Sequence, residues 1–421
     1  MSRGRPLVQF MSVDEGDTTA VGRPRVLVLT STLPARPGDG TPEFVLSLAR
    51  GLAQQFAITI VSPRVPGAPR RQVVDGVEIR RFGYFPRRWE GLADGAILEN
   101  LARQRWRVVE VPCLLIAMLW SAVGVGFRHR PDLVHAHWIV PAGLVGVVLR
   151  RLRRVPLVLT VHGADMYGVR GRAYRWLSPR LVGAADLVTA VSADLAGALG
   201  IPEADWVQRV VPMGVDPAVI RAAVGRRDSD PQRLLFVGRL AEKKGADVLL
   251  RALAQVQDAR LVVAGDGPER ADLVQLAHDL GVAGRVDFLG QVSKAQLWEQ
   301  FRDAAAVVIP SRVARSGDRE GTPVVLAEAA AAGVPVIASA VGGLAERIRS
   351  GVDGILVPPE DVDALAAVID KATANPSWLA AFGREGQQRL AAELDIAHTT
   401  ARYDEFYRAV MARTSSGPHP P

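Results

Sequence analysis

Short runs of aliphatic and β-branched residues alternate with stretches of helical periodicity along this chain of 421 residues, and the alternation starts afresh near the middle. In the first half, strands are predicted at 25–29, 57–61, 77–82, 132–136, 157–161 and 186–190. In the second half, they are predicted at 233–237, 260–264, 285–289, 306–309, 334–338 and 354–357. Strands that alternate with helices form parallel sheets covered on both faces. The chain is therefore predicted to be an α/β protein with two Rossmann-like, doubly wound domains.

The two series of strands are separated by residues 209–217, where prolines and a glycine interrupt regular structure, and by the polar stretch 226–232. Open parallel sheets bind ligands at the carboxyl ends of their strands, so two facing sheets would form a cleft there. We expect the following parts: a disordered tail at 1–22, an N-terminal acceptor-binding domain at 23–212, a C-terminal donor-binding domain at 213–390, a C-terminal helix at 391–413 and a disordered tail at 414–421.

The formal net charge of +7 belongs to the first half of the chain. Residues 1–210 carry 27 Lys and Arg against 17 Asp and Glu, whereas residues 211–421 carry 24 against 27. The arginines lack the aromatic interleaving of single-strand binders, so no nucleic-acid partner is expected. Two interpretations of the basic half stay open: a solvated surface, or a face for anionic lipid or a phosphate-bearing acceptor.

The polar first 22 residues contain no apolar run of the kind a secretory signal needs, and the single cysteine, Cys113, allows no intramolecular disulfide. We therefore expect a cytoplasmic protein. The prediction extends to peripheral contact with the inner face of the membrane.

The 17 residues 111–127 are uncharged. A helix of that length covers about 25 Å, less than the ~30 Å hydrocarbon core, so we expect a buried or membrane-surface helix.

Two carboxylates flank a helix start in the second half. Glu320 precedes Gly321-Thr322-Pro323, and Glu328 follows eight residues after Glu320. Pro323 suits the first turn of a helix, so both carboxylates fall on one face and can accept hydrogen bonds from sugar or ribose hydroxyls. Free N–H groups at the helix start add donors, on Gly321, Thr322 and Val324. Two glutamates eight residues apart usually lie on a solvated helix face and bind nothing. The prediction of a binding site therefore depends on the neighbouring motifs in the sequence.

The surroundings include a cationic turn. A strand ends at Val237, Gly238 and Arg239 follow, and Lys243 and Lys244 open the next helix. Two cationic groups and a helix N-terminus suit a diphosphate. Since the chain has only four lysines and two of them fall at this turn, we prefer a diphosphate site to ordinary surface charge.

Several further motifs follow in order: Val237-Gly-Arg-Leu240, Lys244-Gly245, Gly265-Asp-Gly-Pro-Glu269, Pro310-Ser311, Glu320-Gly321, Glu328-Ala329, Gly333-Val-Pro-Val336, Val341-Gly-Gly343 and Glu346. Together they resemble the donor half of the retaining GT-B glycosyltransferases of glycosyltransferase family 4 (group 1). The resemblance is dense over residues 209–360. The loop 312–319 is longer than the minimal family spacing.

The resemblance implies a retaining transfer of a sugar from a nucleoside-diphosphate sugar to an acceptor hydroxyl, in polysaccharide, glycolipid or cell-envelope glycan synthesis. Arg239 and Lys244 would hold the diphosphate and do what a divalent metal does elsewhere, so neither metal nor other cofactor is expected. Glu328 would hold the ribose hydroxyls, and Glu320 those of the transferred sugar. The resemblance also implies that a last helix near 399–412 crosses back onto the first domain. Front-face attack is expected, and a covalent intermediate stays open.

The first half supplies the acceptor side. His162 follows the strand 157–161 at its carboxyl end and resembles the active-site histidine of the family, which would contact the donor sugar, with Asp165 assisting. His137, at the end of another strand, would line the acceptor pocket. As a zinc pair, His135 and His137 lack a third ligand in register.

The first strand-to-helix loop contains Gly38, Asp39 and Gly40 and lacks the Gly-x-Gly-x-x-Gly fingerprint, which disfavours a dinucleotide-dependent oxidoreductase. Gly40 is a candidate acceptor-side residue.

The expected partners are a nucleotide-sugar donor and a saccharide or lipid-linked acceptor. Two alternatives stay open: a catalytically inactive nucleotide-sugar-binding partner in a glycan assembly complex, and a GT-B phosphorylase or sugar-phosphate synthase.

Overall fold

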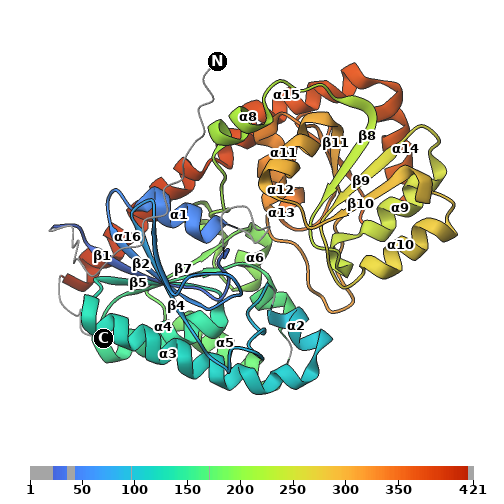
Figure 1. The fold of residues 1–421 in the computed structure, drawn as a ribbon. Helices are drawn as coiled ribbons and strands as arrows, with labels where there is room; N and C mark the ends of the chain where they lie inside the picture. Colours follow the sequence, from blue (N-terminus) through green and yellow to red (C-terminus); the bar gives the residue numbers. More distant parts are fainter. Residues whose placement is uncertain (1–21, 36–42, 96, 170, 416–421) are drawn as a thin grey trace, which may run out of the picture.

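The computed structural model describes residues 22–35, 43–95, 97–169 and 171–415, and it contains two β-sheets (Figure 1). The first sheet has the order β3-β4-β2-β1-β5-β6-β7, and the second has the order β10-β9-β8-β11-β12-β13. Neighbouring strands are parallel except β3 and β4, which are antiparallel. The prediction of two doubly wound parallel-sheet domains is confirmed.

The strands of the first sheet are β1 (Arg25–Leu29), β2 (Ala57–Pro63), β3 (Arg71–Val74), β4 (Val77–Phe82), β5 (Leu133–His137), β6 (Leu157–Val161) and β7 (Leu187–Ala190). Those of the second are β8 (Asp230–Val237), β9 (Arg260–Ala264), β10 (Val286–Gly290), β11 (Ala304–Ile309), β12 (Val336–Ser339) and β13 (Ile355–Val357). Every predicted strand is present, with ends shifted by up to three residues. Strand β3 was not predicted, because it is a short, half-exposed partner in a hairpin rather than a member of the strand–helix alternation.

The helices of the first half are α1 (Phe44–Leu52), α2 (Ile97–Arg103), α3 (Glu110–His129), α4 (Leu144–Arg153), α5 (Arg172–Gly183), α6 (Ala193–Ala198) and α7 (Trp206–Arg209). Those of the second half are α8 (Pro217–Val224), α9 (Ala246–Gln255), α10 (Arg270–Asp279), α11 (Lys294–Asp303), α12 (Val324–Ala332), α13 (Gly343–Arg347), α14 (Val362–Ala374), α15 (Pro376–Glu393) and α16 (Ile396–Ser415).

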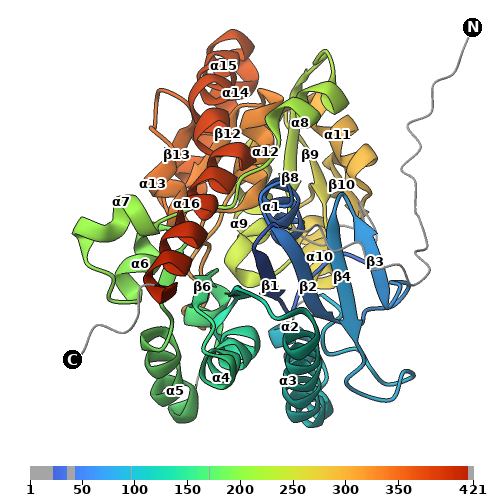
Figure 2. The same cartoon turned by 90° about the vertical axis from the view of Figure 1, so that its left-hand side faces the viewer.

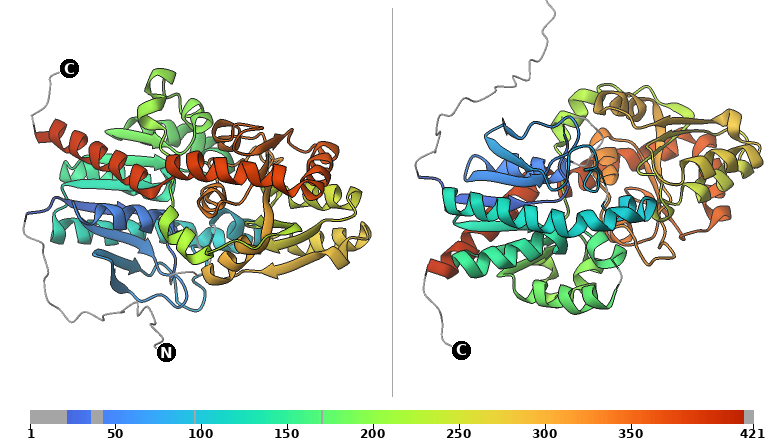
Figure 3. Two further views of the ribbon diagram at one scale, coloured as in Figure 1. Left: turned by 90° about the horizontal axis from the view of Figure 1, so that it is seen from above. Right: turned by 60° about the horizontal axis from the view of Figure 1, so that its bottom comes forward.

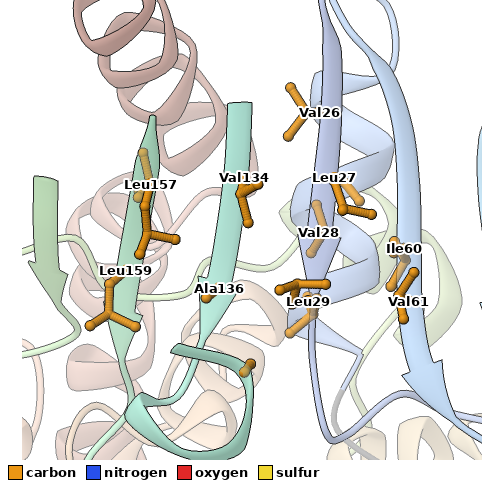
Figure 4. Packing of buried hydrophobic residues seen from close by; sticks show 14 of the residues in the cluster. Val26, Leu27, Val28, Leu29, Ile60, Val61, Val134, Ala136, Leu157 and Leu159 are labelled. Carbon is orange, nitrogen blue, oxygen red and sulfur yellow. The ribbon is translucent and has the colours of Figure 1, made fainter. Parts of the chain in front are cut away.

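The first sheet is buried on both faces. Strand β1 reads Arg-Val-Leu-Val-Leu, and its four aliphatic residues are buried, the continuous apolar run expected of a central parallel strand. Figure 4 shows these side chains beside those of the neighbouring strands. Helices α1 and α16 cover one face, and α3, α4 and α5 lie side by side on the other (Figures 1 and 2).

Helix α16 belongs to the first domain in space although it follows the second in sequence. Asp395 forms a β-bridge with Val215 where the chain returns, and α16 then runs along the first domain (Figure 3). Tyr403 and Tyr407 are fully buried in the first core. Helix α1 comes so close that a Cβ on Gly51 would lie 2.3 Å from the hydroxyl of Thr400.

The uncharged segment 111–127 forms most of α3. One side of this helix packs on the first sheet through Leu114, Met118 and Ala122, all of which are buried. Together with the preceding 3-10 turn η1 (Arg105–Val109), it is long and apolar enough to cross a membrane by length and composition alone. Its packed side makes it a helix of the first domain, as expected.

Candidate functional site

The carboxyl ends of β8 and β11 carry the predicted donor residues. Gly238 and Arg239 follow β8, and the short 3-10 helix η5 (Glu242–Lys244) leads into α9. Gly245, with φ of 65°, joins the two helices, and a Cβ there would lie 1.9 Å from the carbonyl oxygen of Pro310. Only glycine tolerates both the left-handed backbone and that approach. The turn that carries Lys243 and Lys244 therefore packs directly against the loop that begins after β11.

That loop brings Glu320 to the cationic turn. Lys244 Nζ lies 3.1 Å from Glu320 Oε2, and Lys243 Nζ lies 3.9 Å from Glu320 Oε1. The Glu320 side chain is buried. Burial by itself would raise the pKa of Glu320, but the two ammonium groups outweigh it and hold the pKa below its ordinary value. Glu320 is therefore an ionised acceptor at neutral pH, as binding of sugar hydroxyls requires.

The long loop 312–319 is anchored on the donor side rather than loose. Arg312 donates from Nε to the carbonyl oxygen of Glu242 over 2.9 Å, and its Nη1 lies 3.1 Å from Asp247 Oδ2. Asp318 lies 3.1 Å from the ammonium of Lys243. These contacts fix the loop on η5 and α9, so its extra length does not displace Glu320 from Lys244.

Glu328 is buried on α12 and pairs with Lys294 at 2.5 Å. Lys294 was not predicted as a site residue, although it is one of only four lysines in the chain. Its ammonium also lies 5.0 Å from the ring centroid of Trp298, one turn further along α11. The carboxylate expected to accept ribose hydroxyls is thus held by a cation at the start of the neighbouring helix.

The start of α12 is fixed by contacts to both domains. Pro323 occupies the N-cap position, one residue before the first turn where it was predicted, and Val324 is the first helical residue. The carbonyl oxygen of Gly321 accepts a hydrogen bond from Gly343 N over 3.1 Å. Thr322 donates its hydroxyl to the carbonyl oxygen of Val191, in the first domain, over 3.0 Å.

The two domains meet at this point. Arg319 donates from Nε and Nη2 to both carboxylate oxygens of Asp194, at 2.8 and 2.6 Å, and its guanidinium lies 4.3 Å from the ring centroid of Tyr167. A Cβ on Gly163 would lie 3.8 Å from the carbonyl oxygen of Arg319 and from Gly321 N. The loop that carries His162 therefore faces the loop that carries Glu320.

Glu346, the last member of the motif series, also spans the two domains. Its carboxylate accepts hydrogen bonds from the backbone of Ala193 and Asp194, over 2.8 and 2.7 Å. An acidic side chain at the start of α6 satisfies N–H groups that have no partner within the helix. This third contact between the domains was not predicted, because nothing local marks its partner.

His162 is half-buried in an aromatic setting. Its ring centroid lies 4.8 Å from that of Trp138 and 4.9 Å from that of Phe44, and its Nε2 lies 2.9 Å from His137 Nδ1. Burial, with a smaller contribution from His137, holds the pKa of His162 well below its ordinary range. The imidazole is neutral at pH 7, and one nitrogen of the His162–His137 pair must donate while the other accepts.

His137 and Asp165 lie behind His162. His137 is buried, and burial lowers its pKa to about 3. Asp165 is also buried and accepts hydrogen bonds from His162 N over 3.2 Å and from Ile139 N over 3.1 Å. The structure thus places both residues against the His162 loop. His137, predicted for the acceptor pocket, is buried and contacts His162.

A further buried network, which was not predicted, connects this cluster to α16. His135 Nδ1 lies 2.6 Å from Tyr407 Oη, and His135 Nε2 lies 2.8 Å from Thr160 Oγ1. Tyr403 Oη contacts the same Thr160 hydroxyl at 2.8 Å. The rings of His135 and His137 contact each other in a tilted arrangement, with centroids 4.2 Å apart.

The remaining predictions concern a metal site, Gly40 and the residues that follow β8. In the described part of the chain, no group of three His, Cys, Asp or Glu side chains is arranged to hold a metal ion. Gly40 lies outside the described residues. Gly238 and Arg239 lie at the end of β8 as expected, and a Cβ on Gly95 of the first domain would lie 3.6 Å from Arg239 Nη1.

Comparison with known sequences agrees with this division of the chain. Residues 221–389 match the family "Glycosyl transferases group 1", and residues 38–219 match "Glycosyltransferase Family 4". The D-inositol 3-phosphate glycosyltransferase 1 of Catenulispora acidiphila is 32% identical over 92% of this chain and 95% of its own length. The glycogen synthase of Mycobacterium tuberculosis is 30% identical over 66% of this chain and 70% of its own length.

Comparison with solved structures shows the same architecture. Sucrose-phosphate synthase from Thermosynechococcus elongatus superposes with a TM-score of 0.73 at 24% identity, covering 93% of this chain and 100% of that one. The Anabaena protein HepE in complex with UDP-glucose superposes with a TM-score of 0.68 at 20% identity, covering 91% and 99%. Both are neighbours in the GT-B fold.

Proposed function

Because this chain belongs to the group 1 glycosyltransferases of the GT-B fold, we propose that it transfers a sugar from a nucleoside-diphosphate donor to an acceptor hydroxyl with retention of configuration. In this proposal, the diphosphate binds at Arg239 and Lys244, and the ribose binds at Glu328. The transferred sugar then lies between Glu320 and His162.

One observation carries the proposal: Lys244 and the buried Glu320 form an ion pair opposite the loop of His162. A nucleotide sugar needs a cation for its leaving phosphate and acceptors for its sugar hydroxyls a few ångströms apart. The pair supplies both at one place. The HepE complex with UDP-glucose supports the same class of donor for this chain.

The proposed chemistry follows from these charges. The bond between the anomeric carbon and the phosphate oxygen breaks, and Lys244 and Arg239 stabilise the negative charge that develops on the diphosphate. The acceptor oxygen forms its bond on the same face, and its proton passes to the departing phosphate oxygen. Neutral His162 forms a hydrogen bond with the transferred sugar, as donor or acceptor, and adds no charge to the site. Two fixed cations perform the work of a metal, so we propose that transfer is metal-independent.

The test uses the purified protein with a panel of nucleotide sugars and with acceptors that include inositol 3-phosphate, the compound in the name of several relatives. We expect nucleoside diphosphate release that depends on the acceptor, an α-configured product by NMR from an α-configured donor, and full activity in EDTA. Loss of activity in EDTA would overturn metal independence, and an inverted product would overturn retention.

Two variants separate transfer from the alternatives. Glu320→Gln should abolish most transfer while nucleotide binding, measured by thermal shift, is retained. Nucleotide binding without transfer to any acceptor in the wild-type protein would favour an inactive binding partner. Activity that requires inorganic phosphate or a sugar phosphate would instead favour a phosphorylase or a sugar-phosphate synthase.

A further inference from the structure

The outer surface of the layer formed by η1, α3, α4 and α5 is unusual for a water-exposed face, and we call it the apolar–basic face. Figure 3 shows these helices lying side by side on the side of the first domain away from α16. An ordinary surface helix turns an apolar stripe to the core and a polar face to water. Helix α3 has apolar residues on both sides.

The outward side of α3 carries a regular stripe of large apolar residues. Val109 immediately precedes the helix, and Ile116, Trp120 and Phe127 follow at steps of seven, four and seven residues, which places them on one helical face. Their exposed fractions are 53%, 56%, 72% and 59%. Leu114, on the opposite side, is buried against the sheet. Such a contiguous exposed stripe marks an interaction surface.

Neighbouring elements extend the stripe. Leu152 at the end of α4 is 62% exposed, and Trp176 on α5 is 61% exposed. Trp106 in η1 is 48% exposed. Large apolar residues therefore reach the surface from all four elements of the face.

The same four elements are strongly basic. They carry arginines at 105, 107, 128, 150, 151, 153, 172, 175 and 180. Glu110 is the one acidic residue within these described elements, and it is buried beside Arg107 at 2.8 Å. The face is thus positively charged around an apolar centre.

Arginines and aromatic rings are paired on this face. The guanidinium carbon of Arg153 lies 4.6 Å from the ring centroid of Phe127, and that of Arg180 lies 4.1 Å from the ring centroid of Trp176. Arginine can cover an apolar ring with its stem and still extend its charge to the boundary with water. Tryptophan and arginine are the residues that anchor proteins at the membrane–water interface.

We propose that the apolar–basic face docks on the surface of an anionic lipid bilayer. The stripe of α3 enters the boundary between headgroups and acyl chains, and the arginines contact lipid phosphates. Helix α3 does not span the bilayer, because its other side is part of the first core. A second copy of the chain is a poorer occupant, since a twofold interface would place these arginines against one another.

Docking has a consequence for the cleft. The first residue of α3, Glu110, accepts a hydrogen bond from Leu92 N over 3.1 Å, and the segment that follows Leu92 reaches Arg239 at Gly95. Docking through α3 would therefore hold Arg239, a residue of the proposed donor site, near the bilayer surface. The docking proposal stands whether or not the proposed sugar transfer is correct, because binding to vesicles is measured without substrates.

The experiment is flotation of the full-length protein with vesicles of phosphatidylcholine alone or with one third phosphatidylglycerol, at about 0.05 M and about 0.5 M salt. We expect flotation with the anionic vesicles at low salt and a marked decrease at high salt. No flotation of the wild-type protein with anionic vesicles at low salt would overturn the proposal.

Substitutions locate the contact. Trp120→Ser should weaken partition at least about tenfold, because a large apolar side chain no longer leaves water. Leu289→Ser is its matched control, since Leu289 is an exposed apolar residue of the second domain. Arg151→Ala should weaken partition about fivefold, and the exposed Arg251 of α9 supplies the control Arg251→Ala. Equal effects of a variant and its control would overturn the assigned face.

A fluorescent probe provides a second readout. Ile116→Cys in a Cys113→Ala background gives one labelling site on the stripe, because Cys113 is the single cysteine of the chain. An environment-sensitive dye there should shift to shorter wavelength with anionic vesicles, while a dye at Leu289→Cys in the same background should not. Self-association that is lost in Trp120→Ser, without any vesicle binding, would assign the face to a second copy and overturn docking on lipid.

Discussion

Lys244 and Glu320, from two different loops of the second domain, place opposite charges 3.1 Å apart, with the carboxylate buried and the ammonium partly buried. Each charge satisfies the other in this arrangement. A nucleotide sugar offers each of them a new partner, phosphate for the ammonium and hydroxyls for the carboxylate. Under the proposed function, the pair is a preformed donor site in which Lys244 binds the phosphate and Glu320 binds the sugar hydroxyls.

The first prediction concerns the cation of that pair. Lys244→Ala should lower kcat/KM by about 10²-fold to 10³-fold, because a fixed positive group no longer stabilises the leaving phosphate. The measurement is acceptor-dependent release of nucleoside diphosphate. Lys371→Ala is the control, since Lys371 lies on α14 against Trp378. A Lys244 variant as active as the control would contradict the leaving-group role.

The second prediction concerns the ribose contact. Glu328→Gln should weaken binding of the nucleoside diphosphate by about tenfold or more, because hydrogen bonds to an ionised group are lost. Isothermal titration calorimetry measures the affinity. Glu299→Gln, an exposed position on α11, should bind like the wild-type protein. Equal affinities for the Glu328 variant and the wild-type protein would remove Glu328 from the donor site.

The third prediction is a pH dependence of stability. Burial raises the pKa of Asp165 from 3.8 to about 6, although four backbone N–H groups oppose the shift. Between these values the folded protein keeps a proton that the unfolded chain has lost. The contribution of Asp165 to stability therefore falls as pH rises from about 4 to about 6, by up to about 3 kcal/mol.

Asp165→Asn should remove that component of the pH dependence. Urea unfolding followed by tryptophan fluorescence between pH 4 and pH 7 measures it. The exposed Asp370 supplies the control Asp370→Asn, which should follow the wild-type curve. If the Asp165 and Asp370 variants show the same pH dependence, the raised pKa is wrong.

The fourth prediction concerns the hydrogen bond between α16 and the first sheet. Tyr407→Phe leaves a buried nitrogen of His135 without its partner, so the free energy of unfolding should fall by about 1–3 kcal/mol. Asp404→Asn breaks only a partly exposed ion pair with Arg408 on the same helix and should cost far less. Chemical denaturation compares the two, and similar losses would contradict a special role for the buried network.

The fifth prediction concerns the contact across the cleft. Arg319→Ala removes both hydrogen bonds to Asp194 and the contact with Tyr167. We expect a larger radius of gyration in small-angle X-ray scattering without substrate, and a KM for the donor that changes more than kcat. Arg315→Ala, in the same loop but with a 98% exposed side chain, is the control. An unchanged radius in the Arg319 variant would show that other contacts keep the domains together.

Much of the architecture could be predicted because its signal is local. The strand Arg25–Leu29 was predicted with its observed ends, since a buried parallel strand is a continuous apolar run. Lys244 and Glu320 were selected together because ordered motifs surround both. Their contact follows from a parallel sheet, which gathers the loops after its strands at one edge.

The remaining features depend on partners far apart in sequence. Arg319 and Asp194 are separated by 125 residues, and His135 and Tyr407 by 272. No local pattern marks such pairs, so neither the contact across the cleft nor the buried network was predicted. The strand-end position of His137 suggested an acceptor pocket, but the fold packs its ring between those of His135 and His162.

The position of α16 also determines the order in which the molecule is completed on the ribosome. The first domain places Tyr403, Tyr407 and Val410 among its buried residues, so its core stays open until the last helix has been synthesised. The second domain, by contrast, has all its strands by Val357 and can close earlier. Domains usually finish folding in the order of synthesis. In this chain, the first domain is synthesised before the second, but its core is completed after that of the second.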